Sequence, residues 1–268
     1  SFSITVQNDA PSNHFNTVLY TGTGSSQSIT SVGFAPDFVW IKDRDATNWH
    51  NLQDTIRGAT KHLYSNATNA EDTTSNGLTS FDSNGFTIGG GGGFGNNGNN
   101  FVAWNFKAGG AAVANTDGSI NSQVSVNNTL GFSIVKYTGN NTAGATVGHG
   151  MDAVPELIIW KVLTSVSGWK VYCNQFTSPT TQIMELQDTG GVSTNTVFIN
   201  GTAPSTSLIT LGAYGDTNGS GQEHIAYCFH SVDGYSKIGS YTGTGASGNS
   251  IVTGFRPAFV MIKITTAS

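Results

Sequence analysis

Four glutamates are the side chains of this 268-residue chain best suited to acid–base chemistry, at Glu71, Glu156, Glu185 and Glu223. Glycoside hydrolysis needs two carboxylates about 5 to 9.5 Å apart. On one strand of a sandwich glucanase they would stand at positions i and i+4, with a further acid between them. None of the glutamates begins such a pattern, and Glu185 and Asp188, three residues apart, would lie on opposite faces of a strand. The sequence therefore disfavours a hydrolase, and we expect no catalytic residues.

The remaining reactive side chains have no spacing that indicates a metal or cofactor site. The six histidines are scattered, and no Gly-x-Ser-x-Gly run opens a helix. In residues 43–48, side chains with oxygen atoms stand at alternate positions, as at the start of a calcium-binding loop. The glycine and the distant glutamate of such a loop are missing, so we expect a solvated loop. The glycine run 89–95 leads into a strand, unlike a dinucleotide fingerprint, which opens a helix. Cys173 and Cys228 lie in apolar stretches and are interpreted as two buried thiols, although a disulfide between them stays open.

The tryptophans and one ion pair are the candidates for ligand binding. Trp40, Trp104 and Trp160 lie within apolar runs, which favours core packing. Trp49 and Trp169 follow polar loops and are better placed for a rim, a contact between repeats or stacking on a sugar. Asp54 and Arg57 are interpreted as a structural pair that fixes the turn after Trp49, with a glycan site as the alternative.

The elements that must position these residues come from an internal repeat. A Tyr-Thr-Gly motif begins at Tyr20, Tyr137 and Tyr241, and a proline follows 16, 18 and 16 residues later. Each proline leads a run of apolar residues that ends in lysine, at positions 36–42, 155–161 and 257–263. Later, residues 101–106 correspond to residues 224–229. A unit of about a hundred residues is longer than a solenoid or propeller repeat, so each copy is expected to be a small domain or one lobe of a pair.

These segments predict an all-β fold. Residues 15–20 and 132–137 are short, β-branched and aromatic, which is typical of strands. The Pro-led runs predict buried strands in which proline takes the first position. We expect three units: a first β-sandwich repeat with its N-terminal strand and linker over residues 1–118, a second over 119–235, and the start of a truncated third over 236–268. The third copy stops soon after its lysine, which predicts a fragment of a longer array.

The composition excludes some classes of partner. Charged residues make up 10% of the chain, against roughly 25% in an average soluble domain. The net charge is −5 without a Lys/Arg cluster, so we expect no nucleic-acid binding. No apolar run approaches the roughly 18 residues that span a bilayer, and we expect no membrane partner. A coat of neutral polar residues suits an extracellular or virion-exposed protein.

The repeated pattern resembles a family of structural proteins of tailed bacteriophages, of the marine and cyanophage type, described as tail fibre or virion fibre proteins. The matching pieces lie at residues 33–42, 54–61, 102–110, 145–150 and 226–237, in order over nearly the whole chain. The second repeat lacks the Asp-x-x-Arg-Gly segment of the first. The resemblance implies tandem jelly-roll, concanavalin-like sandwich repeats.

It also implies a non-enzymatic tail fibre, spike or capsid decoration on the outside of the virion, serving assembly and host attachment. The expected partners are further copies of the chain, as a trimer, other virion proteins and a host cell-surface glycan. The alternatives are a carbohydrate-binding module, with Trp49, Trp169, Asp54 and Arg57 as candidate ligand residues, and a glycan depolymerase.

Overall fold

The computed structural model describes residues 10–266, and over this range the regular secondary structure is almost entirely β. Besides its strands it has a 3-10 helix, η1 (Pro11–Asn13), and a four-residue α-helix, α1 (Gly215–Asn218). The predicted all-β class is confirmed. Residues 1–9 of the predicted first repeat and 267–268 of the third lie outside the described residues. Within the described part, no helix has the length and apolar character needed to cross a membrane.

The first half of the chain forms a six-stranded sheet covered on one face by a three-stranded sheet. The large sheet has the order β1-β9-β3-β4-β5-β6, and all of its pairs are antiparallel. Its strands are β1 (Phe15–Thr21), β3 (Phe38–Asp43), β4 (Asn51–Asp54), β5 (Lys61–Tyr64), β6 (Asp72–Thr73) and β9 (Asn100–Phe106). The small sheet consists of β2 (Gln27–Ile29), β7 (Leu78–Asp82) and β8 (Gly85–Ile88).

The second half forms an eight-stranded antiparallel sheet, in the order β10-β11-β12-β19-β14-β15-β16-β17, and a two-stranded sheet. The large sheet contains β10 (Val113–Asn115), β11 (Ser122–Asn127), β12 (Phe132–Thr138), β14 (Leu157–Val162), β15 (Lys170–Cys173), β16 (Gln182–Glu185), β17 (Ser193–Thr194) and β19 (Glu223–Phe229). The small one pairs β13 (Ala145–Gly148) with β18 (Leu208–Leu211). β10, which falls within the predicted linker, pairs with β11 of this second sheet.

The two large sheets place corresponding strands in the same order. In each, the last strand of the copy lies between the first strand and the Pro-led strand: β9 between β1 and β3, and β19 between β12 and β14. The tyrosine of the Tyr-Thr-Gly motif stacks on its register partner in the central strand, Tyr20 on Phe101 and Tyr137 on His224. The predicted strands at residues 15–20 and 132–137 are β1 and β12, and two of the three Pro-led runs contain β3 and β14. Both strands begin two residues after the proline, so the prediction that proline takes the first strand position is wrong.

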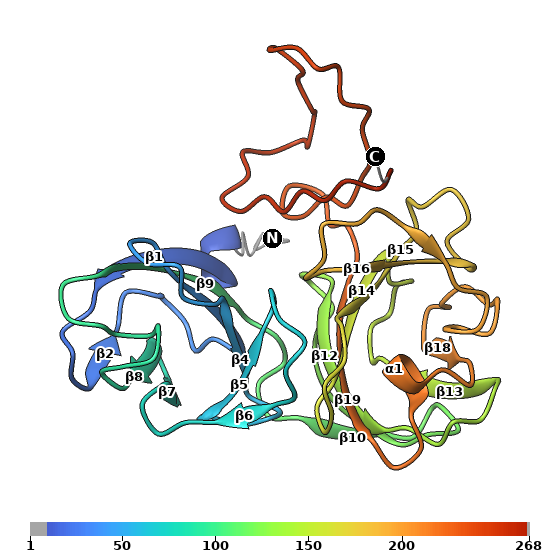
Figure 1. Cartoon of the computed structure of the whole chain (residues 1–268), viewed down its shortest axis with the longest axis horizontal. Helices are drawn as coiled ribbons and strands as arrows, with labels where there is room; N and C mark the ends of the chain where they lie inside the picture. The colour runs from blue at the N-terminus through green and yellow to red at the C-terminus, as the bar shows by residue number, and fades with distance from the viewer. Residues whose placement is uncertain (1–9, 267–268) are drawn as a thin grey trace, which may run out of the picture.

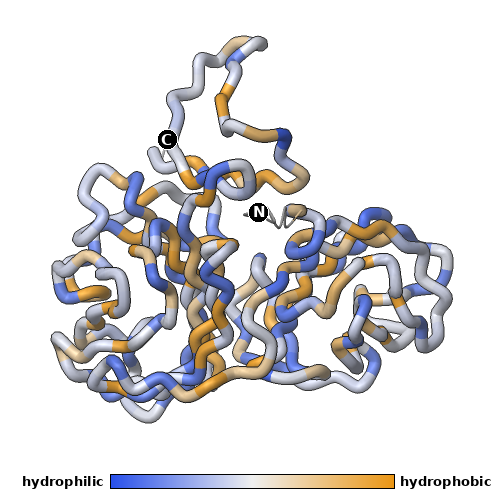
Figure 2. The backbone as a smooth tube through the Cα atoms, turned by 180° about the vertical axis from the view of Figure 1, so that it is seen from behind, coloured by the Kyte–Doolittle hydropathy of each residue, from blue (hydrophilic) through white to orange (hydrophobic). Residues whose placement is uncertain are grey.

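The large sheets of the two copies face each other across a shared hydrophobic core (Figure 1). Phe38 and Leu52 of the first copy pack there with Ile159, Trp169 and Tyr227 of the second. Each outer face is closed by its own small sheet over a separate core. Figure 2 shows hydrophobic stretches along the strands in the middle of the molecule, on both sides of this boundary. Polar side chains that reach this central layer are shielded from water and therefore need hydrogen-bond partners within the protein.

The C-terminal segment, residues 236–266, contains no strand, and part of it arches away from both halves (Figure 1). The prediction of a strand at residues 257–263 is therefore wrong. The run lacks a central strand of the kind that pairs β3 and β14 in the first two copies. Instead, the Phe259 ring rests on the first sheet, with ring centroids 5.5 Å from Trp104 and 6.1 Å from Trp40.

Candidate functional site

Asp54 and Arg57 form a buried ion pair at the end of β4. The turn that follows the strand brings the Arg57 backbone N–H to Asp54 Oδ1 at 2.9 Å, and Arg57 Nε donates to Asp54 Oδ2 at 2.6 Å. Gly58, with φ of 93°, takes the left-handed conformation that closes this turn. Arg57 Nη2 donates to the Leu52 carbonyl at 2.9 Å, and Nη1 lies 3.4 Å from Glu71 Oε2. All three nitrogens of the guanidinium are thus engaged within the protein.

Tyr227 of the second copy completes this cluster. Its hydroxyl donates to Asp54 Oδ2 at 2.7 Å, and its side chain is buried with those of Asp54 and Arg57. Burial alone would lower the pKa of Arg57, but the neighbouring charge of Asp54 raises the pKa above its ordinary value. Burial raises the pKa of Tyr227 well above 10.0. Arg57 therefore stays cationic and Tyr227 keeps its proton. The cluster links the two large sheets, and because its side chains are buried, it offers no accessible surface to a ligand.

Trp169 lies in the same layer. Its side chain is fully buried, its ring stacks on Tyr227, and its Nε1 donates to the Tyr64 carbonyl of β5 at 2.8 Å. Three of the four sequence-predicted ligand residues are thus brought together at the contact between the copies. The indole of Trp169 is not accessible to a sugar from solvent.

Trp49 lies apart from this cluster, with 46% of its surface exposed. The register explains the difference from Trp169. Asn51 and Lys170 occupy equivalent places, since Ile41 pairs with Asn51 and Trp160 pairs with Lys170. Trp49 lies two residues before Asn51, whereas Trp169 lies one residue before Lys170. In an extended chain, an offset of one residue turns the side chain to the opposite face. Trp40 and Trp160 are also one residue out of register with each other, since Trp40 lies four residues after its proline and Trp160 five. Of these two, only Trp160 is fully buried, in the outer core of the second copy.

A hollow of about 270 Å³ surrounds Trp49. Its lining consists of Thr47, Asn48, Trp49, Asn51, Tyr64 and Gly92. The edge-to-face contact of the Trp49 and Tyr64 rings, 4.7 Å between centroids, forms one wall. Asn51 is buried, and its Oδ1 has no hydrogen-bond partner in the protein. Aromatic rings, amides and a hydroxyl without a formal charge are suited to a neutral polyhydroxy ligand.

Asp43 fixes the position of Asn48, one of the residues that line this hollow. Its buried carboxylate accepts hydrogen bonds from Asn48 Nδ2 at 2.9 Å, from Asn99 Nδ2 at 2.8 Å and from the backbone N–H groups of residues 45 and 46. Burial alone would raise the pKa of Asp43, but these four donors together lower the pKa below 3.8. In the loop of residues 43–48, which was considered as a calcium site, the buried Asp43 carboxylate thus holds the Asn48 side chain in place. Among residues 10–266, no three His, Cys, Asp or Glu side chains are grouped as a metal site requires.

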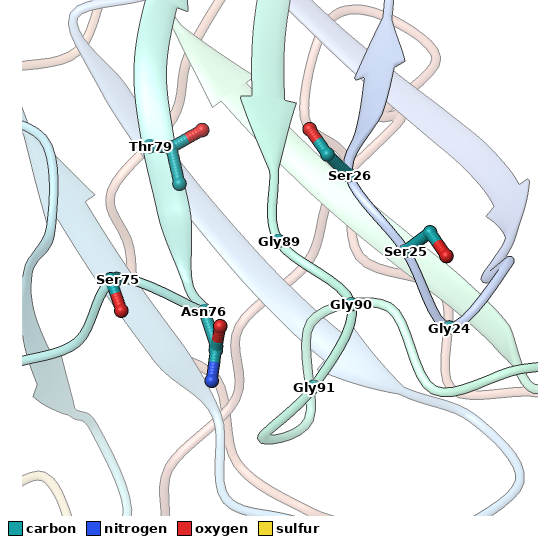
Figure 3. A pocket seen from close by; sticks show the side chains of 9 residues that line it. All are labelled: Gly24, Ser25, Ser26, Ser75, Asn76, Thr79, Gly89, Gly90 and Gly91. Carbon is teal, nitrogen blue, oxygen red and sulfur yellow. The ribbon is translucent and has the colours of Figure 1, made fainter.

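The glycine run lines a second, larger hollow of about 590 Å³ (Figure 3). Its lining consists of Gly24, Ser25, Ser26, Ser75, Asn76, Thr79 and Gly89, Gly90 and Gly91. A Cβ on Gly90 would lie 2.2 Å from the Gly24 carbonyl oxygen, so only glycine allows the two loops to approach this closely. The hollow offers hydroxyl groups and one amide, and no aromatic or charged side chain lines it.

Sequence reasoning did not find Tyr227, Tyr64 or Asn51. The repeat aligned Tyr227 with Trp104, but nothing in the sequence indicated its contact with Asp54, 173 residues away. Tyr64 connects the two regions, because its carbonyl accepts from Trp169 while its ring contacts Trp49.

Residues 10–268 match a family described as a domain of unknown function, DUF7483. No curated protein and no solved structure matches the chain. Because the match covers all but the first nine residues, the chain belongs to the DUF7483 family.

Proposed function

We propose that this chain is a non-enzymatic structural protein of a phage virion, part of a tail fibre, spike or capsid decoration that serves assembly and host-surface attachment. The observation that carries the proposal is the place of three of the four candidate ligand residues in the structure. Asp54, Arg57 and Trp169 join one copy of the repeat to the other. A charge-poor duplicated β unit of this kind supplies shape and contact area. The sequence pieces shared with phage fibre proteins support the same assignment.

The proposal includes a finer description of fold, partners and place. Each copy is assigned to the jelly-roll, concanavalin-like class of sandwich, with units over residues 1–118, 119–235 and 236–268. The protein assembles as a homo-oligomer, a trimer, with other virion proteins, on the outer surface of the particle.

The test is to locate the chain in the particle. Antibodies against the purified chain should decorate intact virions of the phage that encodes it, and a map of the particle should place its sandwiches there. Sedimentation equilibrium of the purified chain should give a trimer at micromolar concentration. Labelling confined to material that does not cosediment with particles would overturn the virion role, and a monomer would overturn the trimer.

Carbohydrate binding is the second candidate, favoured by the hollow at Trp49. Its exposed indole lies beside the Tyr64 ring, with the neutral side chains of Thr47, Asn48 and Asn51 around them. Binding on a glycan array that disappears with Trp49→Ala would support this module. Tyr241→Ala is the matched control, because Tyr241 is exposed to a similar degree, at 49%, but lies in the C-terminal segment.

A depolymerase is the third and weakest candidate. Release of reducing ends from host polysaccharide by the purified chain would establish it. Release that persists after Trp49→Ala would place the chemistry elsewhere than in this hollow.

A further inference from the structure

The two copies carry different chemistry at one equivalent place on their large sheets. Asn51 and Lys170 correspond to each other in the strand register. The next strand places Tyr64 opposite Asn51 and Glu185 opposite Lys170. The equivalent residues are therefore Trp49, Asn51 and Tyr64 in the first copy, and Gly168, Lys170 and Glu185 in the second.

In the second copy this place is occupied by ion pairs. Lys170 Nζ pairs with the Glu185 carboxylate and lies 3.2 Å from Asp216 Oδ2. The lysine side chain is only 7% exposed, and Gly168 supplies no ring where the first copy has its indole. The second copy thus offers charges that are already paired, whereas the first offers exposed aromatic and amide groups.

The side chains around the Trp49 hollow are held in fixed orientations. Tyr64 is anchored at both ends, because its hydroxyl hydrogen-bonds with His62 Nε2 at 2.6 Å and its carbonyl accepts from Trp169. Asn51 Nδ2 donates to the Trp49 carbonyl at 3.2 Å. Less side-chain freedom is then lost when a small ligand binds, which favours affinity.

Asp43 determines how the Asn48 amide is turned. Asn48 Nδ2 donates to Asp43 Oδ2 at 2.9 Å. Because a carboxylate can only accept, the amide nitrogen must lie on this side, and Asn48 Oδ1 is directed away from Asp43. Asn48 lines the hollow, so this oxygen can accept from a ligand hydroxyl. Thr47 adds a hydroxyl that can donate or accept.

The charges around the hollow select against an acidic ligand. None of its six lining residues has an acidic or basic side chain that is ionised at neutral pH. The loop of residues 43–48 carries two aspartates and one arginine, and so a net charge of −1. Lys42 Nζ donates to the backbone carbonyls of residues 43 and 46. A carboxylate on the ligand would therefore meet the charge of Asp43 without a cation in the lining to balance it.

We propose that the Trp49 hollow binds one ring of a neutral pyranose sugar, and that the pair of copies has this site once. The proposal deepens the second candidate function and rests on it. The C–H face of the sugar ring lies on the half-exposed indole, and hydroxyls at the edge of the ring reach Asn48 and Thr47. A volume of about 270 Å³ is sufficient for a single hexose ring.

The expected affinity for one ring is weak. A ligand of hexose size in an open hollow should bind with Kd on the order of 1 mM. Firm attachment to a surface that displays many such rings then requires several copies of the chain to bind together. A site of this strength suits a protein that is present in multiple copies.

The test follows the indole N–H signal of Trp49 by NMR in the whole chain, with Trp49→Phe to assign it. Methyl glucopyranoside and methyl galactopyranoside are the probes. Glucuronate adds a carboxylate to the ring, and sorbitol has the hydroxyls without a ring face. The methyl glycosides should shift the signal with Kd on the order of 1 mM. Glucuronate and sorbitol should bind at least tenfold more weakly, and the backbone signals of residues 168–170 should not move.

Two substitutions of exposed side chains test the two parts of the recognition, followed by the backbone signal of Gly92. Trp49→Ala should abolish binding of the methyl glycosides, because it removes the stacking surface. Thr47→Lys places a cation in the lining and should strengthen glucuronate relative to methyl glucopyranoside by at least fivefold. An unchanged preference in Thr47→Lys would contradict selection by charge.

The proposal is overturned if glucuronate or sorbitol binds the parent chain as tightly as the methyl glycosides, or if the shifts lie at residues 168–170. Array binding of acidic glycans that depends on Trp49 would leave the carbohydrate module standing and overturn only the neutral pyranose. Absence of binding by every probe and on the array would remove the module and the pyranose site together. The virion role is decided separately, by the location of the chain in the particle.

Discussion

The Tyr227 hydroxyl of the second copy donates a hydrogen bond to the Asp54 carboxylate of the first, at 2.7 Å. Both side chains lie in the layer between the large sheets, which is otherwise lined by aromatic and aliphatic groups. A hydrogen bond in such a layer has a fixed direction, unlike an apolar contact. It therefore sets how the two sheets lie relative to each other.

Tyr227→Phe should lower the free energy of unfolding by about 2 kcal/mol, because the hydrogen bond that it removes ends on a buried charged group. Tyr137→Phe is the matched control, since that hydroxyl donates to the neutral Thr217 carbonyl. The control should lose about 1 kcal/mol. Urea unfolding of both variants measures the difference, and equal losses would contradict the role given to Asp54.

Trp169→Phe should be far more damaging than Trp49→Phe. The first removes the hydrogen bond to the Tyr64 carbonyl and leaves a void in the shared core, at about 2 to 3 kcal/mol. The second changes a half-exposed ring and should stay within about 0.5 kcal/mol of the parent. Thermal unfolding followed by circular dichroism compares them, and a reversed order would refute the assignment of Trp169 to the core.

Acid should destabilise the protein through His224. Burial lowers the pKa of this fully buried imidazole to about 4, from 6.5. Above pH 6.5 the group is neutral in both states and has no effect. Between pH 6.5 and 4 only the unfolded chain takes up the proton, so up to about 3 kcal/mol of stability is lost as the pH falls.

His224→Phe, which copies Phe101 of the first repeat, should flatten this part of the stability–pH curve. The charged neighbours Asp216 and Lys161 remain in the variant. Unfolding by urea at pH 7 and pH 4.5 gives the comparison. Parallel curves for the two proteins would show that another group causes the loss.

Gly212→Ala should destabilise strongly, by about 3 kcal/mol or more, because the new Cβ would lie 1.4 Å from the Val197 carbonyl oxygen. Gly215→Ala, three residues on at the start of α1, meets no atom within 4 Å and should be close to neutral. Chemical unfolding and soluble yield report on both. A Gly212→Ala protein as stable as the parent would disprove the close approach of these two loops.

Thiol labelling should distinguish the two free cysteines. Burial raises the pKa of Cys228 to about 12, so its thiolate is scarce at pH 8 and its sulfur is covered. Cys173 is half-buried, and burial also raises the pKa of its thiol. A disulfide-exchange reagent should modify Cys173 slowly in the native protein and Cys228 only after unfolding. Rapid modification of both thiols in the native state would contradict this placement.

The strands were predictable from sequence because their signals are local. Residues 15–20 and 132–137 combine β-branched and aromatic residues between turns, and the structure has strands there. The Pro-led runs show the limit of such reasoning. The runs after Pro36 and Pro155 are strands, but the run after Pro257 is not, because pairing depends on a distant strand: β9 begins 64 residues after Pro36, and β19 begins 68 residues after Pro155.

The candidate site was predictable only in part, for a similar reason. The Asp54–Arg57 pair lies within one turn and was inferred from its spacing. The positions of Trp49 and Trp169 after their prolines differ by a single residue, and alternation along a strand turns that difference into opposite surroundings. Tyr227 approaches Asp54 only because two sheets face each other, and no local pattern encodes that approach.

The middle position of β9 and β19 has a consequence for how the chain is made. Each is the last strand of its copy, so the ribosome releases β1 and β3, and later β12 and β14, long before the segment that joins them. Until then the nascent chain exposes unpaired strand edges, which are prone to aggregation. Synthesis therefore passes through two vulnerable intervals, each of which ends when the final strand emerges and closes the sheet.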